Sequence, residues 1–295
     1  MTRLVLRSQP IVPLLLLLAL FLPVSAHANH EGKPHPLWEL GVAGGWAGYD
    51  AYAGSSNRKA VAAGTPYLIY RGKYLRASGK SARIVLYERP RFWIDISGSG
   101  WPPVNTEDAP ARSGMPKLDL MVEGGPRINW VAFRTDTLRL RLRFPVRAAV
   151  SFDTPIDASR EGYTIEPSAR LRWRPGGEEG RVGFTLTLSA FWGSAAYNAY
   201  YYDVDPAFAT GTRPAHHAGP GLDWLSARLS VGWRITPDVV VGAFVDPKWL
   251  GPGSVDDSPL VEKDRALNLG AGINWVVWRS GERVSGREVN DEAVH

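Results

Sequence analysis

One stretch of this sequence, residues 135–150, alternates large apolar side chains with arginines at every second position. The alternating residues are Leu138, Arg139, Leu140, Arg141, Leu142, Arg143 and Phe144. On a helix this order would spread charge around the whole circumference, whereas on a strand successive side chains point to opposite faces. The stretch therefore predicts a β-strand with one apolar and one cationic face. Such a strand fits a soluble sandwich with its arginines in water, or a transmembrane barrel with its leucines in lipid and its arginines in the lumen.

The period of two recurs along the chain, and no window of comparable length has the 3.6-residue period of an amphipathic helix. The alternating segments are residues 38–42, 92–96, 118–123, 165–173, 184–190, 225–235 and 267–275. In segment 118–123, the apolar face is expected to carry Leu118, Leu120 and Val122, opposite Asp119 and Glu123. The pattern predicts an all-β chain of many short strands.

The connections between these strands alternate in length. Tight turns are expected at 88–91, 134–137 and 236–238, and longer connections rich in Gly, Pro and Asp at 100–117, 153–161, 202–220 and 251–264. This alternation is typical of outer-membrane β-barrels, which have short periplasmic turns and long extracellular loops. An even number of antiparallel strands with both termini in the periplasm satisfies it. Splitting residues 65–78 at residues 71–73 gives twelve strands, and ten remain if the first segment lies outside the wall.

The first 28 residues have the three-part layout of a secretory signal peptide. Arg3 and Arg7 precede an apolar run at residues 11–24, and the small residues Ala26 and Ala28 predict cleavage after Ala28. An uncleaved transmembrane anchor is the alternative, but the apolar run is short and contains or adjoins prolines. We therefore expect an exported protein of the Gram-negative cell outer membrane.

Composition narrows the choice between sandwich and barrel. The sequence contains no Cys, which excludes a disulfide scaffold and a cysteine nucleophile. Removal of residues 1–28 lowers the formal charge from +5 to about +3, which is too little for a nucleic-acid-binding surface. Beyond residue 28 no apolar run approaches the roughly 18 residues of a transmembrane helix. A membrane protein of this kind must be a closed barrel, because only closure satisfies the backbone groups of strands in lipid. We assign residues 29–278 to it.

Aromatic residues gather at strand ends, as in the two girdles of a membrane barrel. They are Trp38, Tyr49, Tyr52, Trp101, Trp130, Phe133, Trp173, Trp192, Trp224, Trp249, Trp275 and Trp278. Ordinary core packing in a soluble sandwich is the alternative interpretation.

Charged residues fall on the strand faces that are predicted to point into the lumen. They are Glu39, Asp95, Asp119, Glu123, Arg139, Arg141, Arg143, Glu166, Arg170, Arg172, Arg228 and Arg234. Neighbouring arginines on one strand face lie about 7 Å apart and repel each other, so the lumen must supply carboxylate partners. We expect a structural ion-pair network, and the alternative is a set of selectivity residues for small anions.

Several segments, taken in chain order, resemble the MipA/OmpV family of outer-membrane proteins. They are WELGVAGGW (38–46), PYLIYRGKYLRA (66–77), SGMPKLDLMVEGGPRINW (113–130), LRLRLRFPVRAAVS (138–151) and VGAFVDPKWLGPGSVDDSPLV (241–261). Two family-motif loops lie within them, one containing Gly114, Met115 and Pro116 and the other Asp257, Ser258, Pro259 and Leu260. The ordered series covers nearly all of residues 36–278.

The resemblance implies an outer-membrane barrel that contacts outer-membrane lipid. It further implies a scaffold whose partners are a murein (peptidoglycan) lytic transglycosylase and a bifunctional murein synthase, recruited at the periplasmic face. Other members are treated as porin-like or adhesion-related, so a narrow channel with a basic lumen for small anionic solutes is the alternative function. The chain departs from the usual ending of such barrels on an aromatic residue, here Trp278. Residues 279–295 follow it and are expected to form a polar, disordered periplasmic tail.

No sequence motif for catalysis or cofactor binding is present, neither G-x-S-x-G, nor H-E-x-x-H, nor a phosphate-binding glycine loop. No histidine falls on a predicted strand, which disfavours a Ser–His site in the wall. The adjacent pairs His216-His217, Asn29-His30 and Asp256-Asp257 are weak metal candidates, because neither their spacing nor their surroundings supply a full ligand set. We therefore expect no catalytic residue, cofactor or metal, although a carboxylate pair from two separate strands would escape sequence analysis.

Overall fold

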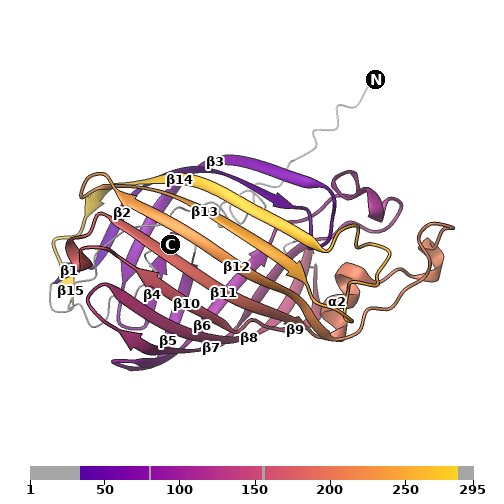
Figure 1. The fold of residues 1–295 in the computed structure, drawn as a ribbon, viewed down its shortest axis with the longest axis horizontal. Coiled ribbons are helices and arrows are strands. Elements are labelled where there is room, and N and C mark those ends of the chain that lie inside the picture. Colours follow the sequence, from indigo (N-terminus) through magenta and orange to yellow (C-terminus); the bar gives the residue numbers. More distant parts are fainter. Residues whose placement is uncertain (1–33, 80, 155–156, 285–295) are drawn as a thin grey trace, which may run out of the picture.

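The computed structural model describes residues 34–79, 81–154 and 157–284. The signal peptide predicted at residues 1–28 and the end of the predicted tail, residues 285–295, lie outside the described residues. The described chain forms a closed antiparallel β-barrel, and Figure 1 shows its tilted strands wrapping around one axis.

The barrel wall has twelve strands, as predicted. Its segments are β2 (Trp38–Asp50), β3 (Arg58–Arg71), β4 (Leu75–Ser78), β5 (Ser81–Arg89), β6 (Phe92–Trp101), β7 (Leu120–Arg134), β8 (Leu138–Thr154), β9 (Asp157–Ile165), β10 (Ser168–Trp173), β11 (Val182–Gly193), β12 (Gly221–Arg234), β13 (Val239–Leu250) and β14 (Arg265–Arg279). Apart from β9 and β10, each segment pairs with the next, and β14 pairs with β2 to close the wall. The segments β9 and β10 act as one wall strand, because both pair with β8 and with β11. Only Glu166 and Pro167 separate them, and proline has no N–H to donate to a ladder.

Strand β8 separates its side chains as the alternating sequence predicts. Leu142 and Phe144 are 37% and 46% exposed on the outer face, whereas Arg141 is 2% exposed on the inner face. The outer faces of the other strands likewise carry exposed leucine, isoleucine and tryptophan side chains. A soluble protein does not expose so large an apolar surface, whereas a membrane barrel carries an outward apolar band around a polar interior. The soluble-sandwich alternative is therefore wrong.

The two ends of the barrel differ. One end carries the tight turns that follow β5, β7 and β12, together with the paired strands β1 (His35–Pro36) and β15 (Arg283–Val284). The opposite end carries the helix α2 (Ala195–Tyr202) and the long connections that follow β6 and β13 (Figure 1). Bacterial barrels have short periplasmic turns and long extracellular loops, which assigns the first end to the periplasm and the second to the exterior.

Two predicted segment boundaries differ from the structure. Residues 153–161 are not a long loop, because β8 extends to Thr154 and β9 begins at Asp157. Residues 279–284 are not a disordered tail, because Arg279 ends β14 and β15 pairs with β1. Both segments are polar and lack an apolar period, and backbone pairing rather than side-chain burial makes them strands.

The extracellular connections contain the short helices. Ser194 caps α2, since its Oγ accepts hydrogen bonds from the backbone N–H groups of Tyr197 and of Tyr163 on β9. The 3-10 helices are η2 (Thr106–Asp108), η3 (Pro110–Arg112) and η5 (Pro206–Phe208) at this end, and η4 (Gly177–Glu179) at the periplasmic end. Among the described residues, no helix has both the length and the apolar character needed to cross a membrane.

The strands between β3 and β6 are shorter than the other strands of the wall. Strand β4 pairs with β3 only at residues 69–71, and β5 pairs with β6 no further than Ser97. One further backbone bond joins Gly79 N–H to the carbonyl of Leu68, at 2.8 Å. Beyond it, β3 has β2 as its one partner strand within the described residues.

Candidate functional site

Asp95 is the centre of the first of three ion clusters in the lumen. The carboxylate is fully buried, and it accepts two hydrogen bonds of 2.9 Å from the guanidinium of Arg127 on β7. Trp93 Nε1 donates to it at 3.2 Å, and Arg83 Nε lies 4.0 Å away on β5. The cluster therefore ties three adjacent strands together through one carboxylate.

Glu123 is the centre of the second cluster, near the extracellular end. Its Oε1 accepts hydrogen bonds from Trp101 Nε1 at 2.8 Å and from Tyr197 Oη at 3.3 Å. Its Oε2 accepts from Thr164 Oγ1 at 3.0 Å and lies 3.7 Å from Arg147 Nη1. This carboxylate therefore joins the wall to helix α2 inside the barrel.

Glu39 is the centre of the third cluster, at the periplasmic end. It pairs with Arg71 on β3 and lies 3.5 Å from Arg279 on β14. Glu166 pairs with Arg147 at 3.1 Å, which links the break between β9 and β10 to the second cluster. The predicted carboxylates Glu39, Asp95, Glu123 and Glu166 thus all contact arginines on other strands.

The arginines of β8 face those of β10 across one ladder. The register places Arg141 opposite Arg170 and Arg139 opposite Arg172. Arg141 also lies over the ring of Trp93, with the guanidinium carbon 5.5 Å from the ring centroid. The register therefore gathers four guanidinium groups on one side of the lumen, and such a cluster is the feature that the channel alternative requires.

The remaining predicted lumen residues lie in the lumen with separate contacts of their own, except Asp119. Arg143 Nε donates to Ser168 Oγ at 3.1 Å, and Arg228 lies 3.7 Å from the ring centroid of Phe244. Arg234 donates to a periplasmic backbone carbonyl at 3.1 Å. Asp119 is the exception, since it precedes β7 in the extracellular connection and pairs with a nearby lysine at 3.2 Å.

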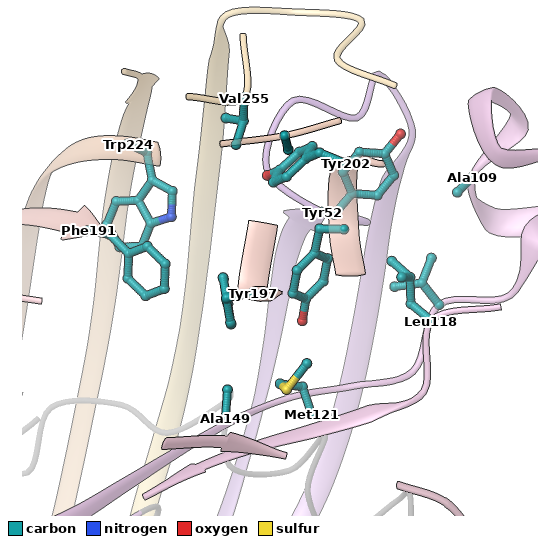
Figure 2. Packing of buried hydrophobic residues seen from close by; sticks show 13 residues of the cluster. Tyr52, Ala109, Leu118, Met121, Ala149, Phe191, Tyr197, Tyr202, Trp224 and Val255 are labelled. Atoms are coloured by element: carbon teal, nitrogen blue, oxygen red, sulfur yellow. The ribbon is translucent and has the colours of Figure 1, made fainter. Parts of the chain in front are cut away.

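A buried aromatic core, which we call the extracellular plug, fills the lumen at its outer end. Its residues are Tyr52, Val104, Ala109, Leu118, Met121, Ala149, Phe191, Tyr197, Tyr201, Tyr202, Ala218, Trp224 and Val255. Figure 2 shows Phe191 and Trp224 on one side, Leu118 and Ala109 on the other, and the tyrosines Tyr52, Tyr197 and Tyr202 between them, with Met121 and Ala149 below. The plug therefore spans the lumen from wall to wall.

The prediction that Leu118 faces lipid is wrong. Strand β7 begins only at Leu120, and Leu118 instead forms an isolated bridge with Val104 in the connection after β6. Its side chain is 2% exposed because it packs in the extracellular plug.

The two family-motif loops meet against this plug. Met115 and Leu260, which lie on different loops, pack together with Val204 in a separate buried cluster. Ser258 Oγ donates to the carbonyl of Tyr202 at 2.7 Å, and the carbonyl of Leu260 accepts a 2.7 Å hydrogen bond from Tyr52 Oη. The segments that carry the resemblance therefore hold the plug in place.

Burial raises the pKa of the plug tyrosines. Desolvation is the main cause that raises the pKa of Tyr52 to about 12, and it also raises the pKa of Tyr197, Tyr201 and Tyr202 well above the ordinary value. Burial also lowers the pKa of the Arg112 guanidinium, which donates to the carbonyl of Tyr201 at 2.7 Å. The tyrosine hydroxyls are therefore neutral hydrogen-bond donors at physiological pH.

A cavity of about 110 Å³ lies within the plug. Its walls include Trp101, Phe191 and Trp224, and its polar groups include Asp223 and Lys248. The ammonium of Lys248 lies 3.9 Å from the ring centroid of Trp224 and 5.5 Å from that of Trp101. Phe191 stacks on Trp224 at 4.8 Å, so aromatic rings and one held cation enclose the space.

Four aromatic residues predicted in the membrane girdles lie inside the barrel instead, and the alternating pattern did not predict the cavity. Tyr49, Tyr52, Trp101 and Trp224 line this cavity. The alternation of side chains along a strand could have placed two of them inside. Trp101 lies on the same strand face as Asp95, and Trp224 lies on the same strand face as Arg228. The tyrosine-rich α2 follows a Ser N-cap, which is a usable signal for a short helix.

The candidate metal pair Asn29-His30 lies outside the described residues, and the two side chains of the pair His216-His217 contact different carboxylates. His216 lies 3.7 Å from Asp257, whereas His217 lies 3.0 Å from Asp203. In the part of the chain that the structure describes, no group of three or more His, Cys, Asp or Glu side chains is arranged to hold a metal ion. His35, expected before the first strand, lies in β1.

Comparison with known proteins identifies a family. The family model described as MltA-interacting protein MipA matches residues 40–277. No curated protein matches. Among solved structures, the NanC porin covers 81% of this chain and is itself covered completely, with 9% identity and a TM-score of 0.37. The outer membrane phospholipase A from Escherichia coli covers 88% of this chain, with 95% of its own length, 11% identity and a TM-score of 0.33.

Proposed function

Because this chain belongs to the MltA-interacting protein MipA family, we propose that this outer-membrane barrel is a scaffold that recruits murein-synthesising and murein-degrading enzymes at its periplasmic face. The partners are a lytic transglycosylase, as the family description suggests, and a bifunctional murein synthase. The barrel then supplies membrane attachment and a binding surface, and the recruited enzymes supply the chemistry.

The observation that carries this proposal is the extracellular plug. A porin needs a continuous aqueous lumen, whereas here buried aromatic side chains cross the lumen at its outer end. A barrel of about twelve strands is narrow enough for side chains to fill it. A filled barrel supports a role at the surface of the molecule over a role as a pore.

The periplasmic turns offer a rigid surface for a partner. The N–H of Thr135 donates to the carbonyl of Leu138 at 2.7 Å, and the N–H of Arg174 donates to that of Thr137 at 2.8 Å. Asp238 contacts Arg279, and its carbonyl accepts from Val276 N–H at 2.9 Å. Such pre-organised turns lower the ordering cost of association.

The test measures whether the immobilised barrel retains a partner enzyme. A short polar peptide inserted at Asp136, in a periplasmic turn, is expected to abolish retention of a purified lytic transglycosylase on the immobilised barrel. The same peptide inserted at Gly211, in an exposed extracellular connection, is the matched control and is expected to leave retention unchanged. Equal retention by both insertions and the parent would refute a periplasmic docking face.

The channel remains the second candidate because of the cationic ladder of β8 and β10. Purified protein in planar bilayers is expected to give no steady conductance while the plug is intact. Steady anion-selective conductance in the parent protein would favour the channel and would count against the scaffold as the main role.

A further inference from the structure

In the part of the chain that the structure describes, the barrel wall has an opening between β3 and β6, which we call the wall opening. It is bounded by residues 58–67 of β3 on one side and residues 98–101 of β6 on the other. The end of the β4–β5 hairpin bounds it on the periplasmic side. On the extracellular side, Lys59 Nζ pairs with Asp108 at 2.8 Å, which ties the connection after β6 to the start of β3.

The register determines which backbone groups point into this opening. The N–H of Arg71 donates to Leu37 on the β2 side, whereas the carbonyl of Leu68 accepts from Gly79 on the β4 side, each at 2.8 Å. In an antiparallel strand, alternate residues direct both backbone groups to alternate sides. The even-numbered residues of β3 therefore direct their N–H and C=O groups into the wall opening.

The backbone groups at the periplasmic end of this edge are satisfied locally, whereas those further along β3 are not. Pro66 has no N–H, and its carbonyl accepts a 3.0 Å hydrogen bond from Thr65 Oγ1. The backbone groups of residues 60, 62 and 64 that point into the opening have no hydrogen-bond partner among the described residues. The rims carry no side chain larger than a methyl group on these outward positions, which are Ala60, Ala62, Gly64, Gly98 and Gly100.

The wall opening lies beside the lipid-facing band. Trp46, which pairs with Ala62, is 43% exposed on the outer face, and Val42, which pairs with Pro66, is 50% exposed. Ile84, on the hairpin next to the opening, is 50% exposed. Lipid-exposed sheet edges do not occur in the hydrocarbon region unless protein covers them or they line a water-filled space. No described residue pairs with residues 60–64 on this side, so within the described chain the edge of β3 borders a space that connects with the lumen.

The inner face of β3 supports this conclusion. Val61 and Ala63, which point inward beside the opening, are partly exposed. On the adjacent strand, the inward side chains of Ala47 and Ala43 are only 4% exposed. The inner face of β3 beside the opening is therefore more accessible than the inner positions Ala43 and Ala47 on β2.

A second copy of this chain does not fit the edge. Two barrels with the same orientation in one membrane present identical edges that run in the same direction along the membrane normal. Because barrel strands tilt by about 35–45°, those edges cross at twice this angle and cannot form a ladder. The wall opening is thus suited to a molecule that passes through it.

We propose that the wall opening is a lateral entrance through which a small aromatic molecule dissolved in the outer leaflet reaches the cavity in the extracellular plug. The cavity lies at the level of the opening, because Trp101 ends the rim of β6 and Tyr49 pairs with Lys59 of β3. Its volume of about 110 Å³ is smaller than the roughly 150 Å³ of an engineered cavity that binds benzene, which limits the ligand to a single ring. Its aromatic walls and the ammonium of Lys248 suit the edge and face of a single ring.

The first experiment measures access through the wall in lipid vesicles. The chain has no Cys, so Ala63→Cys and Ala43→Cys each provide one thiol, both pointing inward on neighbouring strands. A lipid-soluble maleimide is expected to label Ala63→Cys about tenfold faster than Ala43→Cys, because thiol labelling follows access. Adding Ala62→Trp, which fills the opening, is expected to reduce the rate to that of Ala43→Cys. Equal labelling of both single variants would overturn the proposal.

The second experiment measures ligand entry with 4-fluorotoluene as the probe. In nanodiscs, fluorine NMR is expected to show a bound signal in slow exchange with the bilayer signal. Ala62→Trp is expected to slow that exchange, whereas Ala271→Trp, an outward position on the fully paired strand β14, leaves it unchanged. Absence of a bound signal in the parent protein, or equal exchange in both variants, would overturn the proposal.

Discussion

Removal of Asp95 is expected to destabilise the barrel more than removal of any exposed carboxylate. The Asp95 side chain is fully buried, and the guanidinium groups of Arg127 and Arg83 around it are 9% and 5% exposed. Asp95→Leu leaves two buried cations without this carboxylate. Breaking a buried ion pair by removing one partner costs about 3–5 kcal/mol of folding free energy. Because water in the lumen screens the charges, we expect a cost of about 3 kcal/mol.

A double-mutant cycle separates this pairing from simple loss of volume. Arg127→Leu removes the two 2.9 Å bonds but leaves Asp95 with Trp93 and Arg83. We expect Asp95→Leu/Arg127→Leu to be more stable than the sum of the single changes predicts, by about 1–3 kcal/mol. Denaturant titration in lipid vesicles, followed by tryptophan fluorescence, measures each free energy of unfolding.

The control uses the same type of residue in an exposed pair. Asp153 pairs with Lys117, and both side chains are about half exposed. Asp153→Leu is expected to leave the free energy of unfolding almost unchanged, because surface ion pairs contribute little. If Asp95→Leu proves as mild as Asp153→Leu, or if the cycle is strictly additive, the lumen is wet enough to screen its charges and the structural role of the network is refuted.

Three further predictions test other parts of the structure. Leu142→Arg puts a charge on the lipid face and is expected to cost about 2–4 kcal/mol near the midplane, seen as reduced folded yield in vesicles, whereas Arg141→Leu should insert normally but unfold at lower denaturant. Gly41→Ala is expected to impair closure of the wall, because an added Cβ would lie 2.0 Å from the carbonyl oxygen of Trp275, whereas Gly44→Ala, with its nearest neighbour at 3.8 Å, should fold normally on a heat-modifiability gel. Ser194→Ala removes the cap of α2 and is expected to cost about 1 kcal/mol and to speed amide exchange within the helix by NMR, and unchanged exchange would contradict the capping role.

The alternation of side chains was sufficient to predict the wall, because a strand in lipid must separate its faces at every residue. It placed Arg141 inside and Leu142 outside without any knowledge of neighbouring strands. It could not identify the partner of Arg127, because that depends on the register of β6 against β7. It also missed the plug, because the Tyr197 hydroxyl meets Glu123 only after a connection folds back into the lumen. Contacts of this kind between distant segments leave no local period in a sequence.

The pairing of β14 with β2 has a consequence for how the chain folds. These strands lie near opposite ends of the described chain, yet Glu39 faces Arg279 and Gly48 faces Leu269 in one continuous ladder. Such high contact order makes closure a late and slow event, because the entropy of joining the two ends is lost before the ladder repays it. Until then the first and last strands expose free edges that can pair with other chains. The assembling protein is therefore most prone to aggregation just before β14 docks, and a factor that holds these two edges apart or together would control its yield.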